Sequence, residues 1–81
     1  MDIGVEVSLY PLDARFIPPI QDFIDRLNRH ADLKIVTNSL STQIFGPYDR
    51  VWAALKAEVR PTFERDSKAV FVMKVIGPYE T

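Results

Sequence analysis

The sequence predicts an α+β sandwich, in which a four-stranded antiparallel sheet carries two helices on one face. Four segments have strand patterns, two have apolar residues at helical spacing, and their order is strand, helix, strand, strand, helix, strand. Two βαβ-like halves with right-handed crossovers give the ferredoxin-like arrangement. We expect a single domain of this kind over residues 1–81, because 47% hydrophobic and 26% charged residues are typical of a folded globular chain.

The first strand is predicted by a strict alternation near the N-terminus, since successive side chains of a strand point to opposite faces. The set expected to face the core comprises Ile3, Val5, Val7 and Leu9. The set expected on the sheet face away from the helices comprises Gly4, Glu6, Ser8 and Tyr10.

The first helix is predicted to open at Pro18 and Pro19, because the first turn of a helix needs no N–H partner there. Its apolar stripe comprises Ile20, Phe23, Ile24 and Leu27. We expect its exposed side to carry two ion pairs at a spacing of four residues, Asp22 with Arg26 and Asp25 with Arg29.

Residues 33–38 and 41–45 have strand patterns and are joined by Ser39-Leu40, although this pair lacks the Gly or Asn that a type I′ turn prefers. Gly46-Pro47 is expected to end the second of these strands. The second helix then has a stripe with one polar member, Val51, Ala54, Leu55, Glu58, Val59 and Phe63. Pro61 predicts a kink or an early end of this helix, since it removes a backbone hydrogen bond.

The last strand is predicted over residues 68–76, and Gly77-Pro78 terminates it. Apolar residues occupy both of its faces, with Val70 and Val72 alternating with Phe71 and Met73. A strand of this kind is usually covered on both sides. We therefore predict a homo-oligomer, a dimer or a tetramer, that packs through the sheet.

Charge and composition exclude several classes. Ten basic and eleven acidic residues give a net charge of −1, which argues against nucleic acid as a partner. The absence of cysteine and the single His30 predict no disulfide, no metal site and no cysteine nucleophile. With no signal-peptide pattern and no apolar run of membrane-spanning length, we expect a soluble cytoplasmic protein without membrane contact, and we expect no cofactor.

Small hydroxyl and amide side chains are concentrated over residues 37–46, where strands normally carry β-branched and aromatic residues. Their donors and acceptors lie on both sides of a short turn and can converge on a small molecule. A ligand site is therefore the first functional hypothesis from the residues alone.

Three segments together resemble the YkoF-like family of thiamine- or hydroxymethylpyrimidine-binding proteins. They are Ser8-Leu9-Tyr10-Pro11-Leu12, residues 17–27, and Thr37-Asn38 followed by Ser41-Thr42-Gln43-Ile44-Phe45-Gly46. The resemblance extends from the first strand to residues 69–72 and implies a ferredoxin-like fold, oligomers built by sheet packing, and reversible ligand binding with no catalysis established. Pro61 departs from the family pattern.

An aminopyrimidine requires matched donors and acceptors together with a flat surface. Asn38 supplies both kinds of polar group, an aromatic ring supplies a face, and a carboxylate suits the positive thiazolium of thiamine. The candidate binding residues are Glu6, Ser8, Tyr10, Thr37, Asn38, Ser41, Thr42 and Phe45.

Each of these residues also has a structural interpretation. Asn38 can bond its own backbone two residues on at a hairpin rim, Glu6 can pair with a base of a neighbouring subunit, and Tyr10 can be a packing aromatic. His30 is most simply a cation near a helix C-terminus. The alternative function is a homo-oligomeric structural or regulatory assembly module that binds nothing small. Catalysis is disfavoured because His30 is remote in sequence from the Ser/Thr cluster.

Overall fold

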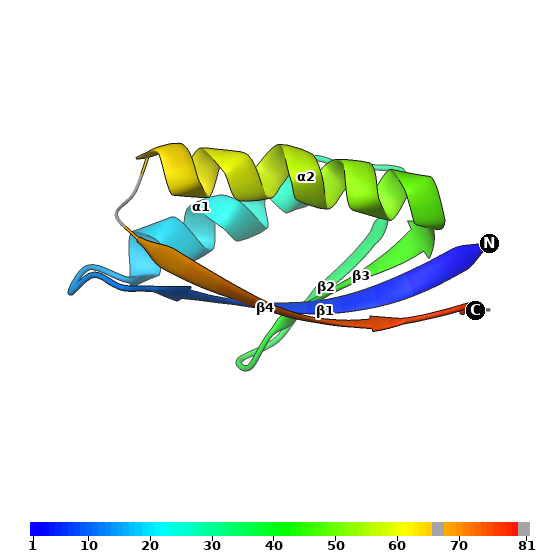
Figure 1. The fold of residues 1–81 in the computed structure, drawn as a ribbon, viewed down its shortest axis with the longest axis horizontal. Coiled ribbons are helices and arrows are strands. Elements are labelled where there is room, and N and C mark those ends of the chain that lie inside the picture. The colour runs from blue at the N-terminus through cyan, green and yellow to red at the C-terminus, as the bar shows by residue number, and fades with distance from the viewer. Residues whose placement is uncertain (66–67, 80–81) are drawn as a thin grey trace.

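The computed structural model describes residues 1–65 and 68–79 and contains the six elements in the predicted order (Figure 1). They are β1 (Asp2–Pro11), α1 (Ile17–Leu27), β2 (Lys34–Thr37), β3 (Thr42–Pro47), α2 (Tyr48–Arg65) and β4 (Ala69–Ile76). The strands form one antiparallel sheet in the order β2-β3-β1-β4. Both helices lie on the same side of the sheet (Figure 1), so the predicted ferredoxin-like α+β fold is confirmed.

The register of the strands separates the two faces of the sheet. Val5 of β1 lies opposite Ile44 of β3, and both side chains are buried beneath the helices. Glu6, the next residue along β1, lies between Gln43 and Lys74 on the open face. The core on the helix side comprises Ile3, Val5, Val7, Leu9, Phe23, Leu27, Leu33, Ile44, Val51, Ala54 and Leu55.

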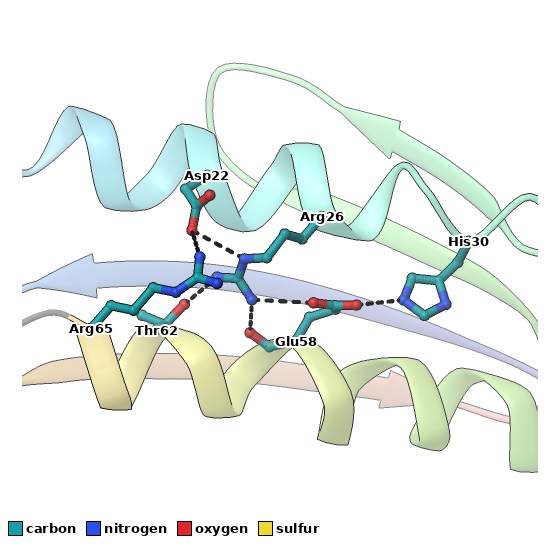
Figure 2. A network of polar contacts seen from close by, with 6 residues as sticks. All are labelled: Asp22, Arg26, His30, Glu58, Thr62 and Arg65. Atoms are coloured by element: carbon teal, nitrogen blue, oxygen red, sulfur yellow. Dashed lines mark hydrogen bonds and ion pairs between the residues drawn. The ribbon is translucent and has the colours of Figure 1, made fainter.

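A polar network joins the two helices (Figure 2), and it overturns the prediction that Arg26 lies on the exposed side of α1. Arg26 is only 5% exposed. Its Nε donates to Asp22 at 3.0 Å as predicted, while its two terminal nitrogens reach across to α2, donating to the Glu58 carbonyl, to Glu58 Oε1 at 3.2 Å and to Thr62 Oγ1 at 2.8 Å. The helical spacing was correct, but the second helix covers this side of α1.

The same network explains the polar member of the α2 stripe. Glu58 is held by Arg26 and also by His30, whose Nε2 lies 2.7 Å from Glu58 Oε2. His30 therefore contacts the second helix as well as following the end of α1. Buried charges require paired, hydrogen-bonded surroundings, and this cluster supplies them.

The early end expected at Pro61 is wrong, because α2 continues through this residue to Arg65. A proline in a helix removes one backbone hydrogen bond and crowds the preceding turn. Pro61 has no N–H to donate to the carbonyl of Ala57, four residues before it. The adjoining carbonyl of Glu58 accepts a hydrogen bond from Arg26, so α1 contacts the α2 backbone within one turn of the proline.

The boundaries of the hairpin also differ from those predicted. β3 begins at Thr42 and includes Gly46 and Pro47, because both still pair with β1 in the register. None of the four turn residues, Asn38 to Ser41, has a positive φ. The turn therefore needs neither Gly nor a left-handed Asn, and the Asn38 N–H donates to the Ser41 carbonyl at 3.0 Å to close it.

The last strand has two apolar faces, as the sequence predicts. Phe71 and Met73 pack against the core, whereas Val70, Val72 and Ile76 are exposed on the open face of the sheet. Within residues 1–65 and 68–79, no helix has the length and apolar character that a membrane span requires.

Candidate ligand-binding site

The candidate site arises from a difference in length between neighbouring strands. β1 pairs with β3 only as far as Val7, which lies opposite Thr42. From Ser8 to Pro11, β1 continues alone beside β4, with Ser8 opposite Val72 and Pro11 opposite Ala69. The edge of β1 that β3 leaves uncovered forms one wall of a cavity.

This cavity has a volume of about 370 Å³, within the range typical of small-molecule sites. Its three walls are the end of β1, the first turns of α1 with the residue before them, and the β2–β3 hairpin. The lining residues are Val7, Ser8, Leu9, Tyr10, Pro11, Phe16, Ile20, Phe23, Ile24, Thr37, Asn38, Ser39, Leu40, Ser41 and Thr42.

The hairpin wall carries the polar groups. Asn38 Oδ1 accepts hydrogen bonds from the backbone N–H groups of Leu40 at 2.9 Å and Ser41 at 3.1 Å. The structural role considered for Asn38 is therefore present, and it occupies the acceptor of the amide. Since the side-chain NH₂ makes no hydrogen bond within the part of the chain that the structure describes, Asn38 is left with donors for a ligand.

Three hydroxyl groups complete this wall. Thr37 Oγ1 and Thr42 Oγ1 lie 3.2 Å apart on the helix side of the sheet, and one donates to the other. The remaining hydroxyl hydrogen of the pair stays free to rotate, so the pair can present a donor or an acceptor. Ser8 Oγ donates to the Leu40 carbonyl at 3.4 Å, which joins the end of β1 to the turn.

The structure brings six of the eight predicted binding residues to this cavity and places two elsewhere. The six are Ser8, Tyr10, Thr37, Asn38, Ser41 and Thr42. Glu6 and Phe45 line a separate hollow on the open face of the sheet. The prediction that all eight surround one small molecule does not fit this geometry, because alternation along β1 and β3 turns Glu6 and Phe45 away from the Thr37–Thr42 pair.

Glu6 and Phe45 have local partners in this second hollow. Glu6 Oε2 accepts from Ser41 Oγ at 3.1 Å, and its other oxygen lies 4.0 Å from the Lys74 ammonium of the same chain. The Phe45 ring lies 5.0 Å from that of Tyr79 and beneath the Lys34 ammonium. Both residues therefore stabilise the open face of the sheet.

The cavity lining contains no charged side chain among the described residues. The aromatic residues Tyr10, Phe16 and Phe23 and the aliphatic Ile20 and Ile24 line the same cavity as the hydroxyl and amide groups. Such a site suits a flat, neutral, partly polar molecule and is a poor one for a phosphate group, which requires clustered cations or free backbone amides. No group of three or more His, Asp or Glu side chains within residues 1–65 and 68–79 is placed to hold a metal ion.

The α1 wall was missed by sequence reasoning. Ile20 and Ile24 belong to the predicted apolar stripe of this helix, yet both remain partly exposed and line the cavity. Phe16, just before the helix, is 52% exposed. The sequence signal for this wall was the apolar stripe of α1. Its Ile20 and Ile24 line the cavity beside the end of β1 that β3 does not cover.

No protein-family model and no curated protein matches the sequence, whereas solved structures match its fold. A hypothetical protein from Methanocaldococcus jannascii is 23% identical with a TM-score of 0.83, covering 99% of this chain and 84% of that one. A protein from Streptococcus pneumoniae is 16% identical with a TM-score of 0.87, covering 98% and 89%.

A third structure, from Thermotoga maritima, bears the description "putative thiamine biosynthesis/salvage protein". It is 14% identical with a TM-score of 0.70, covering 93% of this chain and 82% of that one. At these identities the likeness establishes the ferredoxin-like fold, and the resemblance to the YkoF-like family stays a prediction.

Proposed function

We propose that the chain is a non-catalytic binding protein for thiamine or its hydroxymethylpyrimidine moiety, with the ligand in the cavity between β1, α1 and the hairpin. The observation that carries the proposal is a cavity of about 370 Å³ whose described lining carries no charge and combines aromatic and aliphatic side chains with hydroxyl and amide groups. A neutral aminopyrimidine ring matches both kinds of lining group. The description of the Thermotoga maritima neighbour gives independent support for thiamine-related chemistry.

The lining also favours one orientation of thiamine. Because no carboxylate of residues 1–65 and 68–79 lines the cavity, the neutral pyrimidine is the part of the ligand that belongs inside it. The positive thiazolium then lies towards solvent, where the exposed Tyr10 ring offers a cation–π contact. Glu6, which the sequence offered as a partner for the thiazolium, lies in the other hollow.

Calorimetric titration with thiamine and with hydroxymethylpyrimidine tests the proposal, using two isosteric variants that report on the two hollows. Asn38→Asp keeps the oxygen that closes the turn and removes the NH₂ donors, so we expect weaker binding of the neutral pyrimidine. Glu6→Gln removes a charge from the open-face hollow and keeps an oxygen that can accept from Ser41 Oγ, so we expect unchanged binding.

The same ligands should raise the free energy of unfolding by mass action, by about 2.7 kcal/mol at a free concentration 100 times the Kd. Loss of binding in Glu6→Gln with retention in Asn38→Asp would move the ligand to the open face. No heat and no change in the melting temperature at millimolar ligand would overturn the binding function.

The open face of the sheet favours a second property, which we propose alongside binding. Val70, Val72 and Ile76 are 44%, 49% and 60% exposed, and Ile76 and Phe45 lie on either side of Gly4 of β1. We infer that this face packs against another copy of the chain in a dimer or tetramer. An assembly module that binds no small ligand would keep this property and fail the titration.

A further inference from the structure

The uncovered edge of β1 carries main-chain groups that alternate in direction. The carbonyl of Met1 accepts from Tyr48, which follows β3, whereas the carbonyl of Asp2 accepts from Tyr79, which follows β4. At the other end of β1, the Leu12 N–H donates to the Lys68 carbonyl next to β4 at 2.9 Å. In an antiparallel strand both main-chain groups of a residue point to one edge and those of the next residue to the other. The main-chain N–H and C=O groups of odd-numbered residues of β1 therefore point towards β3, and those of even-numbered residues point towards β4.

Leu9 is the odd-numbered residue just beyond the end of the β1–β3 ladder. Its N–H and C=O point towards the β3 side of β1. No β3 residue lies opposite them, because the β1–β3 ladder stops at Val7 opposite Thr42. The Leu40 carbonyl in the adjoining turn accepts from the Ser8 hydroxyl. Within residues 1–65 and 68–79, neither main-chain group of Leu9 makes a hydrogen bond.

Pro11 supports this assignment independently. It is the next odd-numbered residue, and a proline is tolerated in a strand where its nitrogen faces an unpaired edge. The Leu9 side chain is 9% exposed and packs in the core, which fixes the backbone, while the residue itself lines the cavity. The result is a rigid donor and acceptor, side by side, at the cavity wall.

We propose that the Leu9 N–H and C=O bind the edge of a 4-aminopyrimidine, a pairing that rests on the proposed function. The ring nitrogen next to the amino group accepts from the N–H, and the amino group donates to the C=O. The ligand takes the place of the missing β3 residue opposite Leu9. Side chains of the hairpin then position the ring, whereas the main chain of β1 selects for the amino group.

The pairing is tested by an analogue that reverses both hydrogen bonds. In the 4-oxo counterpart of hydroxymethylpyrimidine a carbonyl replaces the amino group and the neighbouring ring nitrogen carries a hydrogen. The ring N–H would then meet the Leu9 N–H, and the ligand carbonyl would meet the Leu9 C=O. We expect binding of the 4-oxo compound to be on the order of 100-fold weaker than that of the 4-amino compound, since a mismatched polar site rejects a ligand strongly.

A synthetic protein with an ester in place of the Ser8–Leu9 amide removes the Leu9 N–H; it also weakens the Ser8 carbonyl as an acceptor, but that group faces β4 and not the cavity edge. The chain contains no cysteine, so ligation at Ala14 through a temporary cysteine followed by desulfurisation leaves the native sequence. We expect affinity for the 4-amino compound to fall about tenfold, equivalent to one hydrogen bond. The matched control is an ester at Leu12, whose N–H bonds Lys68 on the opposite edge. The control should lose stability and keep its affinity.

The outcomes separate the two proposals. Discrimination against the 4-oxo compound together with a loss of affinity at the Leu9 ester supports the pairing. Equal binding of the two compounds, or equal affinity of the two esters, overturns the pairing and leaves the binding function in place. No binding of any compound by the unmodified protein overturns both.

Discussion

Removing the charge of Glu58 should reveal how strongly the buried network holds the two helices together. Glu58→Gln preserves the shape of the side chain and leaves Arg26 facing a neutral amide. Arg26 and Glu58 side chains are only 6% and 16% exposed, so water cannot replace the lost carboxylate fully. The perturbation therefore acts on the buried Arg26–Glu58 pair and on the contact of His30 with the same carboxylate.

The expected cost follows from the contacts that remain. Breaking a buried pair by removing one partner costs about 3–5 kcal/mol when the surviving charge has no other partner. Here Arg26 keeps Asp22 at 3.0 Å and Thr62 at 2.8 Å, and the Glu58 carbonyl also stays. We therefore expect the free energy of unfolding to fall by about 2 kcal/mol, which for a chain of this size lowers the melting temperature by roughly 8–16 °C.

Urea unfolding followed by fluorescence of Trp52, the single tryptophan of the chain, measures this change. The control is Glu64→Gln, which removes an exposed pair with Arg60 and should cost less than about 0.5 kcal/mol. Replacing both members, in Arg26→Met with Glu58→Gln, should recover part of the loss. Equal costs for Glu58→Gln and Glu64→Gln would refute the reasoning.

Two further predictions concern packing. Gly46→Ala places a Cβ 2.6 Å from the buried Leu33 side chain and should lower the free energy of unfolding by about 1–3 kcal/mol in urea titrations. Gly4→Ala meets Phe45 at 2.9 Å on the open face, where the ring can swing away, so a cost equal to that of Gly46→Ala would contradict this account. Val72→Lys places a charge on the open sheet face and should dissociate the proposed oligomer to monomers in analytical ultracentrifugation at a fixed protein concentration. An unmodified chain that sediments as a monomer would contradict the proposed interface.

The fold could be predicted because its pattern is local. The alternation of Ile3 to Leu9, the two prolines at the start of α1 and the order of the elements are all visible in the sequence. The burial of Arg26 could not be predicted from spacing within α1, since its partners lie more than thirty residues away on α2. Glu58 carried the missing signal, because a charged residue in an apolar stripe requires a buried partner.

The sequence predicted which types of residue line the candidate site, but only part of their arrangement in space. The hydroxyl and amide residues of the hairpin do line a cavity. Alternation along β3 already implied that Thr42 and Phe45 point to opposite faces, so their separation was readable from the sequence. The role of the Leu9 main chain was not, because it depends on where β3 begins relative to β1, and strand ends are set by pairing in three dimensions.

The length of the β2–β3 hairpin determines how much of the β1 edge stays unpaired at the cavity. β3 starts opposite Val7, so two residues inserted in each of β2 and β3 would carry the ladder two residues further along β1, to Leu9. One such step would seal Leu9 into the sheet and close the cavity without altering any core residue. A longer β3 and a bound ligand would thus use the same main-chain groups of Leu9. Members of this fold class can therefore gain or lose a pocket through an insertion or deletion at the turn, while the remaining sequence and the fold stay the same.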